Sequence, residues 1–169
     1  MNYLMIVLRL IHIVSGVFWI GGSLMMTQFV GPAVGSDPQA GQKMLQYLMS
    51  KARVSTWLSA AAGATVLAGA IMYLLDSDFF TSAWTTSGPG IGFAIGAIFG
   101  LIGFGVGIRL GRMNKELAAL GAQIQGQPTP DQAAQLAAIR KSLGTLTPIN
   151  TYSMLLAVLF MATARYFLF

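Results

Sequence analysis

Four apolar stretches constrain this chain more than any other feature of its sequence. A helix needs ~20 mostly apolar residues to cross the hydrocarbon core of a bilayer. The stretches cover approximately residues 3–30, 54–75, 90–110 and 148–168. Only 9% of the residues are charged, whereas soluble domains usually carry about a quarter. Because a backbone in lipid must satisfy its own hydrogen bonds, the four stretches are expected to be helices.

The predicted fold is an all-α integral membrane four-helix bundle that forms a single transmembrane domain over residues 1–169. The first stretch is expected to remain as a span and not to be cleaved as a signal peptide, because its apolar run is too long and contains Arg9. The net charge of +5 does not indicate nucleic-acid binding. The basic residues lie at the edges of the apolar runs, and the predicted partner is the lipid bilayer.

The distribution of lysine and arginine predicts the orientation in the membrane. The middle connection, residues 76–89, has no basic residue and contains Asp76 and Asp78. The other two connections hold Lys43, Lys51, Arg53, Arg109, Arg112, Lys115, Arg140 and Lys141. Basic connections stay in the cytoplasm. We therefore expect a multi-pass protein of the bacterial plasma membrane with both termini outside.

Proline and capping residues predict where several helices begin. Asp37-Pro38 indicates a short helix over about 39–50, and Thr129-Pro130 indicates a second helix that ends near Leu143. Thr147-Pro148 is expected to open the last span in the same way. Together with the continuation of the third span, the second helix forms a predicted cytoplasmic hairpin over about 111–144. The hairpin either ties the two spans together or docks a partner.

Glycines form a stripe along the third span. They are Gly92, Gly96, Gly100, Gly103, Gly107 and Gly111. Small residues allow close approach of membrane helices. The stripe therefore predicts tight packing, within the bundle or in a homodimer, or else room for a flat cofactor beside the helix.

The only histidine of the chain, His12, lies inside the first span. Helical spacing places Arg9, Gly16 and Trp19 on the same side. His12 follows Tyr3 by nine residues, which is ~14 Å along a helix axis and close to the middle of the hydrocarbon. Ionisable residues at such depth are costly and mark functional sites.

Neutral imidazole is an axial ligand of haem iron in membrane helical bundles. Gly16 would leave space for a porphyrin edge, and Arg9 and Arg165 would lie near the propionates. Two simpler roles stay open. Arg9 can pair with an aspartate of the middle connection, and His12 can hydrogen-bond a neighbouring helix through Ser59, Thr65 or a carbonyl.

The second axial ligand is open as well. The chain has one histidine and no cysteine, so a thiolate or a second imidazole from the same chain is excluded. Met161 is the first candidate, with Met154 and Met72 as others. A symmetric dimer that supplies His12 twice and a five-coordinate haem are further possibilities.

The segment "IHIVSGVFWIGG" resembles the first helix of a broad group of bacterial membrane proteins. The group includes the copper-resistance protein D-like membrane domain and the haem-binding membrane protoporphyrinogen oxidase. The match is residue by residue at His12, Trp19, Gly21 and Gly22. The resemblance implies a haem b bundle with His12 as ligand. The sequence departs from the oxidase group in having no lysine within a span, and from copper-handling relatives in its few outer histidines and methionines.

Three functions follow from these observations. The first is a haem b protein with an electron-transfer or redox role, either as an electron carrier or as a haem-dependent membrane oxidoreductase, with a redox partner that the sequence does not identify. The second is a structural or accessory subunit of a larger membrane complex, in which His12 and Arg9 belong to a buried polar network. The third, which only the resemblance implies, is copper handling. No nucleophile motif or phosphate-binding loop points to a soluble type of enzyme.

Overall fold

The computed structural model describes residues 3–124 and 126–168 of the chain. Throughout these residues the regular structure is helical, and four helical segments are long and apolar enough to cross a membrane. They run Tyr3–Ser36, Val54–Asp76, Gly88–Gln123 and Pro130–Tyr166. The predicted all-helical chain with four candidate spans is therefore confirmed, and a multi-pass membrane protein is the class that it fits.

The first segment consists of α1 (Tyr3–Met25), a π-helical turn (Met26–Val30) and α2 (Gly31–Ser36). The wide turn lies just before Pro32, which has no N–H to donate to the preceding turn. The Gly31 N–H bonds to the carbonyl of Met26, five residues earlier, and not to that of Thr27, four residues earlier as in a regular α-helix. Single π-type turns and prolines both disturb the regular bond pattern of an α-helix, and here the helix continues through them.

The remaining helices begin at capped residues or at a left-handed turn. Asp37 accepts the N–H of Ala40 at 3.0 Å at the start of α3 (Pro38–Gln46), and a π-helical turn (Tyr47–Lys51) ends this segment. α4 (Val54–Asp76) follows Arg53, whose φ is 53°. A short 3₁₀ turn (Ala83–Thr86) leads to α5 (Gly88–Gln123), where the Ser87 side chain accepts the N–H of Gly90. Thr129 and Gln132 form the predicted start of α6 (Pro130–Thr163) as a capping box. A 3₁₀ turn (Ala164–Tyr166) ends it.

The prediction of a separate last span starting at Thr147-Pro148 is wrong. α6 runs without interruption from Pro130 to Thr163 and contains Pro148. The proline ring meets the carbonyl of the residue four positions earlier, which here is Gly144, a residue with open space around it. A glycine at this position lets the backbone adjust, and the long packing against α5 holds the helix together on both sides of the proline.

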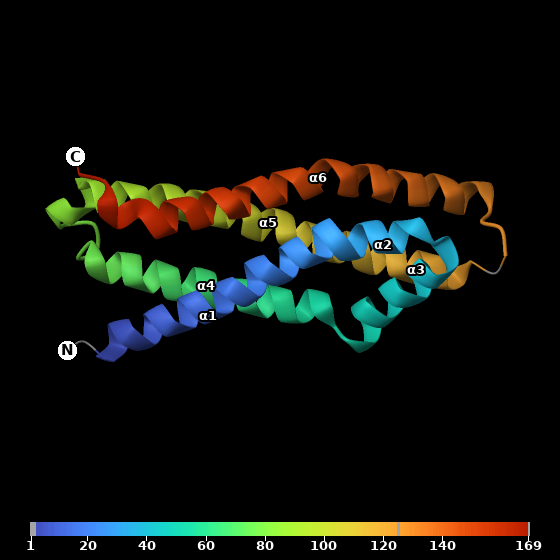
Figure 1. Ribbon diagram of the computed structural model, residues 1–169, viewed down its shortest axis with the longest axis horizontal. Coiled ribbons are helices and arrows are strands. Elements are labelled where there is room, and N and C mark those ends of the chain that lie inside the picture. The colour runs from blue at the N-terminus through green and yellow to red at the C-terminus, as the bar shows by residue number, and fades with distance from the viewer. Residues whose placement is uncertain (1–2, 125, 169) are drawn as a thin grey trace.

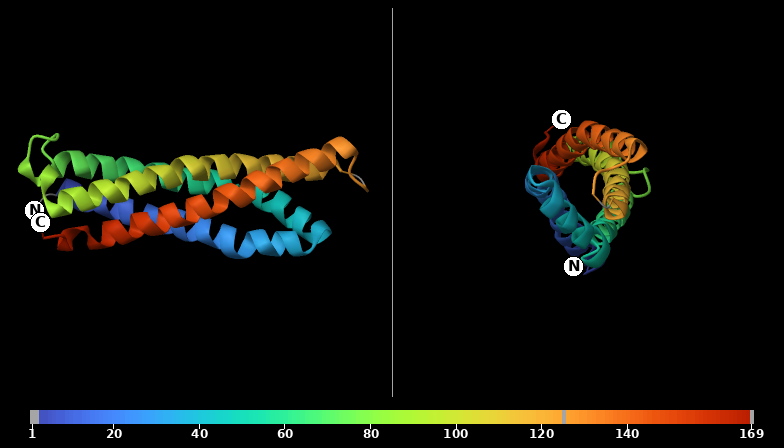
Figure 2. Two further views of the ribbon diagram at one scale, coloured as in Figure 1. Left: turned by 90° about the horizontal axis from the view of Figure 1, so that it is seen from above. Right: turned by 90° about the vertical axis from the view of Figure 1, so that its right-hand side faces the viewer.

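The helices pack as two long pairs. α1 packs along α4, and α5 packs along α6. Figure 2 shows in end view that these pairs form opposite sides of the bundle. In Figure 1 the first and last described residues and the connection 77–87 lie at one end, called the acidic end. Residues 37–53 and the turn between α5 and α6 lie at the other end, called the basic end.

α5 is longer than one crossing of a bilayer requires. α5 has 36 residues, which is ~54 Å at ~1.5 Å per residue, against ~30 Å of hydrocarbon. Its second half contains the charged residues Arg109, Arg112, Lys115 and Glu116. There α3 and the π-helical turn after it pack on α5 through Leu45, Met49 and Ala118, and Gln42 donates to the Ala118 carbonyl at 3.0 Å.

The glycine stripe of α5 packs against a helix along most of its length. A Cβ at Gly92, Gly96 or Gly103 would contact Ala164, Met161 or Met154 of the last segment. Gly107 faces Asn150, while Gly111 faces Ser55 of α4. Gly100 alone among these six has nothing within 4 Å of a built Cβ. The space beside most of the stripe is thus filled by side chains of the last segment, in agreement with the predicted close helix packing.

Candidate functional site

His12 lies in the contact between α1 and α4, half buried. Its Nδ1 is 2.8 Å from the carbonyl oxygen of Thr65. A carbonyl oxygen only accepts, so Nδ1 carries the proton and donates it. In the neutral ring the lone pair then belongs to Nε2. The hydrogen bond fixes both the tautomer and the orientation of the imidazole.

Gly69, one turn after Thr65, makes room for the imidazole. A Cβ built at Gly69 would lie 2.8 Å from Cε1 and 2.9 Å from Nδ1, but 3.9 Å from Nε2. The Nδ1–Cε1 edge therefore lies against the backbone of α4, and Nε2 lies farther from it. Among the described residues Nε2 has no hydrogen-bond partner, so its lone pair is available to a ligand.

Two hydroxyl groups extend the contact one turn towards the basic end. Ser15 Oγ and Thr65 Oγ1 are 2.9 Å apart. Each also reaches a carbonyl of its own helix, Ser15 that of Ile11 and Thr65 that of Ala61. Gly16 is buried below this pair, and its built Cβ would meet the Thr65 methyl at 3.4 Å. α1 and α4 are thus joined by hydrogen bonds at two successive turns.

The other predicted site residues lie apart from His12. Trp19 is 5% exposed and packs with Ala62 and Met154 in the bundle core, with its ring edge-on to Phe104 at 6.2 Å between centroids. Arg9 is exposed on α1, and the described residues give it no ion pair with Asp76 or Asp78. Arg165 is exposed at the acidic end, 5.9 Å from the centroid of the Tyr166 ring.

The three candidate methionines differ in what they face. Met161 packs on Gly96 of α5, with Cε and Cγ each 3.2 Å from a built Cβ. Met154 is 1% exposed in the core. Met72 lies three residues after Gly69 on α4, and helical spacing puts it on the face of α4 that His12 contacts. The structure therefore places Met161 and His12 in different helix pairs.

Sequence reasoning named Thr65 as one of several possible partners and missed Gly69. The signal was present in "TVLAG", which places a hydroxyl residue and a glycine four residues apart on one helical face. Nothing in the sequence links that face to His12, because the register of α1 against α4 is a tertiary property.

No cluster of three or more histidine, cysteine, aspartate or glutamate side chains that could hold a metal ion occurs within residues 3–124 and 126–168. Any iron here would depend on His12 and on donors of other kinds. Comparison with protein-family models, with curated proteins and with solved structures finds no match to this chain.

Proposed function

We propose that this chain is a haem b-binding membrane protein with a redox role, in which Nε2 of His12 is an axial ligand of the iron. One observation carries the proposal. His12 donates Nδ1–H to a backbone carbonyl, and within residues 3–124 and 126–168 nothing pairs with the Nε2 lone pair. Histidines that bind metals almost always donate their other N–H in this way, which fixes the ring and raises its basicity.

The other four residues predicted to bind the cofactor have different roles in this proposal. Arg9 and Arg165 are exposed near the acidic end and could pair with propionates. Gly16 and Trp19 are covered by protein, so in this proposal they position α1 and do not touch the cofactor. The haem, when bound, supplies one-electron chemistry. The chain supplies the ligand, its tautomer and its fixed orientation.

The absorption spectrum of the purified protein tests the proposal. We expect a Soret band that is lost in His12→Ala and kept in Ser15→Ala, which changes the same helix contact without removing the ligand. A colourless protein that also fails to bind added haemin would overturn it. Metal analysis of the same sample distinguishes iron from copper and so tests the copper-handling alternative.

A structural or accessory role is the second candidate, and the hydrogen bonds from His12 and Ser15 to Thr65 favour it. In that case the histidine only joins two helices. His12→Ala would then lower the free energy of unfolding, no chromophore would be present in either protein, and the chain would co-purify with a larger complex.

The orientation is proposed from the charges at the two ends. Residues 77–87 would lie outside and the turn between α5 and α6 in the cytoplasm. The chain has no cysteine, so Ala83→Cys and Gln127→Cys each introduce a single thiol at an exposed position. In intact cells we expect a membrane-impermeant thiol reagent to label the Ala83→Cys variant and not the Gln127→Cys variant. Labelling of Gln127→Cys alone would show that the orientation is the opposite of the proposed one.

A further inference from the structure

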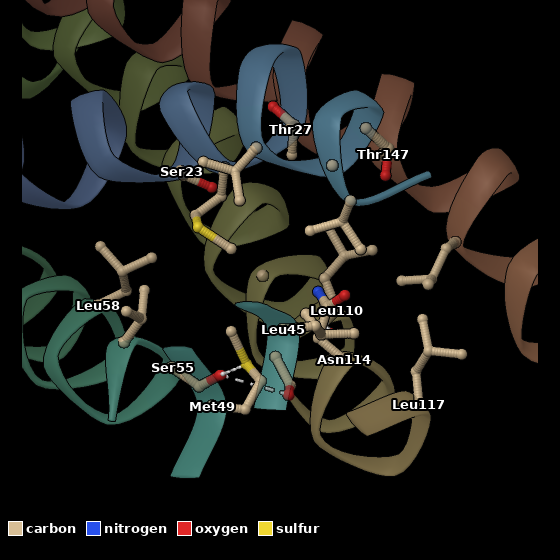
Figure 3. A pocket seen from close by; sticks show the side chains of 18 of the residues that line it. Ser23, Thr27, Leu45, Met49, Ser55, Leu58, Leu110, Asn114, Leu117 and Thr147 are labelled. Carbon is tan, nitrogen blue, oxygen red and sulfur yellow. Dashed lines mark hydrogen bonds between the residues drawn. The ribbon is translucent and has the colours of Figure 1, made fainter. Parts of the chain in front are cut away.

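A cavity of about 650 Å³ lies in the basic half of the bundle, away from His12. It begins beside Trp19 and reaches Arg140, and its walls come from α1 to α6. Figure 3 looks into it, with Ser23 and Thr27 on one wall and Ser55 and Leu58 on the opposite wall. The volume lies within the range of pockets that hold small molecules.

The lining is mainly apolar and carries few polar groups. Apolar side chains such as Leu45, Met49 and Leu110 alternate with hydroxyls such as Thr27 and Thr147. Among the described lining residues Arg140 is the only charged one. A molecule that fits this surface therefore has a long apolar part and an acidic group at one end.

The cavity opens sideways, between two helices. Most of its exposed lining residues lie on α2 and α6, and they are Gly31, Pro32, Gly35, Arg140, Gly144 and Pro148. Three of them are glycines, which leave the opening clear of side chains. Ser59 of α4 is exposed as well. An amphiphile could therefore enter the cavity from the side, between α2 and α6.

The cavity lies towards the polar face of one leaflet. Trp19 follows His12 by seven residues, which is ~10 Å along the helix at ~1.5 Å per residue, and His12 is expected near the middle of the hydrocarbon. One half of the hydrocarbon is ~15 Å thick. The cavity therefore begins inside the leaflet at the basic end and continues through the level of its headgroups, with Arg140 towards the polar end.

The charge at this end favours an acidic headgroup. The basic residues of the two basic connections number eight. The acidic residues there are three, Asp37, Glu116 and Asp131. We propose that the cavity binds an anionic phospholipid, with an acyl chain inserted between α2 and α6 and the phosphate at Arg140.

Lipid titration of the purified protein, followed by native mass spectrometry, tests this proposal. The probes are phosphatidylglycerol and the zwitterionic phosphatidylcholine. We expect the wild type to bind phosphatidylglycerol more tightly, and Arg140→Gln to weaken that binding by about tenfold, as expected for loss of a charged contact. Lys141→Gln removes the same charge from the next residue, which does not line the cavity. It should leave the preference intact.

A cavity-filling variant tests the position of the acyl chain. Thr27→Phe places a ring in the cavity and should reduce binding of both lipids, whereas Ile149→Phe adds a ring at a residue that does not line the cavity and should not. Arg140 is exposed, so its variant is expected to fold even if Thr27→Phe does not.

Equal binding of the two lipids by the wild type, or equal effects of the Arg140 and Lys141 variants, would overturn the proposal. None of these measurements depends on bound haem. The outcome for lipid binding is therefore independent of whether His12 binds iron.

Discussion

The imidazole of His12 lies over Gly69, so close that residue 69 has no room for a side chain. A Cβ at Gly69 would stand 2.8 Å from the ring carbon Cε1, which is well inside van der Waals contact. The glycine lets the ring lie against α4 and places Nδ1 within 2.8 Å of the Thr65 carbonyl. The position of the proposed iron ligand therefore depends on the absence of a side chain on another helix.

Gly69→Ala should displace the imidazole and break its bond to the Thr65 carbonyl. Loss of such an outer hydrogen bond typically weakens a metal site by about 10–100-fold. We therefore expect haemin titration, followed by absorbance, to show a loss of affinity of that order. Gly63→Ala is the matched control, because a Cβ at Gly63 meets nothing within 4 Å. Equal haemin affinity in the two variants would show that α4 does not hold the ring.

Thr65→Val should weaken the contact between α1 and α4 without changing the affinity for haemin. The variant removes the hydroxyl that Ser15 contacts at 2.9 Å and keeps the carbonyl that His12 contacts. Hydrogen bonds between membrane helices average about 0.6 kcal/mol. We expect a loss of that size in the free energy of unfolding by detergent denaturation, with unchanged haemin affinity.

Thr163→Val is the control for this loss. The Thr163 hydroxyl bonds the Leu159 carbonyl of its own helix, so the change removes no contact between helices. A destabilisation equal to that of Thr65→Val would mean that the Ser15 contact contributes nothing.

The sequence predicted the helices well because their causes are local. Apolar length, the Thr129 cap and the run of glycines act within one segment. Pro148 was misread because a proline in a first turn and a proline inside a packed helix look alike in sequence. The partners of His12 and the cavity beside Trp19 depend on how α1 is placed against α4 and α6, and no local pattern encodes that register.

Replacing a glycine of the stripe by alanine should change the free energy of unfolding by an amount that depends on the position. A Cβ at Gly92 would lie 2.9 Å from both Cα and Cβ of Ala164, and this backbone cannot move without separating α5 from α6. We expect Gly92→Ala to lower the free energy of unfolding by about 1–3 kcal/mol, the usual cost of overpacking. Gly100→Ala meets nothing within 4 Å and should be neutral or slightly stabilising, since alanine favours helix. If Gly100→Ala lowered the free energy of unfolding more than Gly92→Ala, the last segment would not pack on α5 as this structure has it.

Asn150 offers a way to stabilise the bundle. It is 1% exposed, and its amide nitrogen donates to Ser23 Oγ at 3.1 Å, while Oδ1 has no partner among the described residues. A Cβ at Gly107 would lie 3.5 Å from Oδ1, a normal contact distance. A serine there could donate its hydroxyl proton to the unpaired oxygen.

Gly107→Ser should therefore raise the free energy of unfolding above that of Gly107→Ala by about 0.5–1.5 kcal/mol, the net value of a typical hydrogen bond. The alanine variant carries the same backbone effect and the same Cβ, so the difference between the two isolates the hydroxyl. Detergent denaturation of both proteins measures it. Serine no more stable than alanine would mean that the Asn150 oxygen already has a partner, such as a buried water molecule.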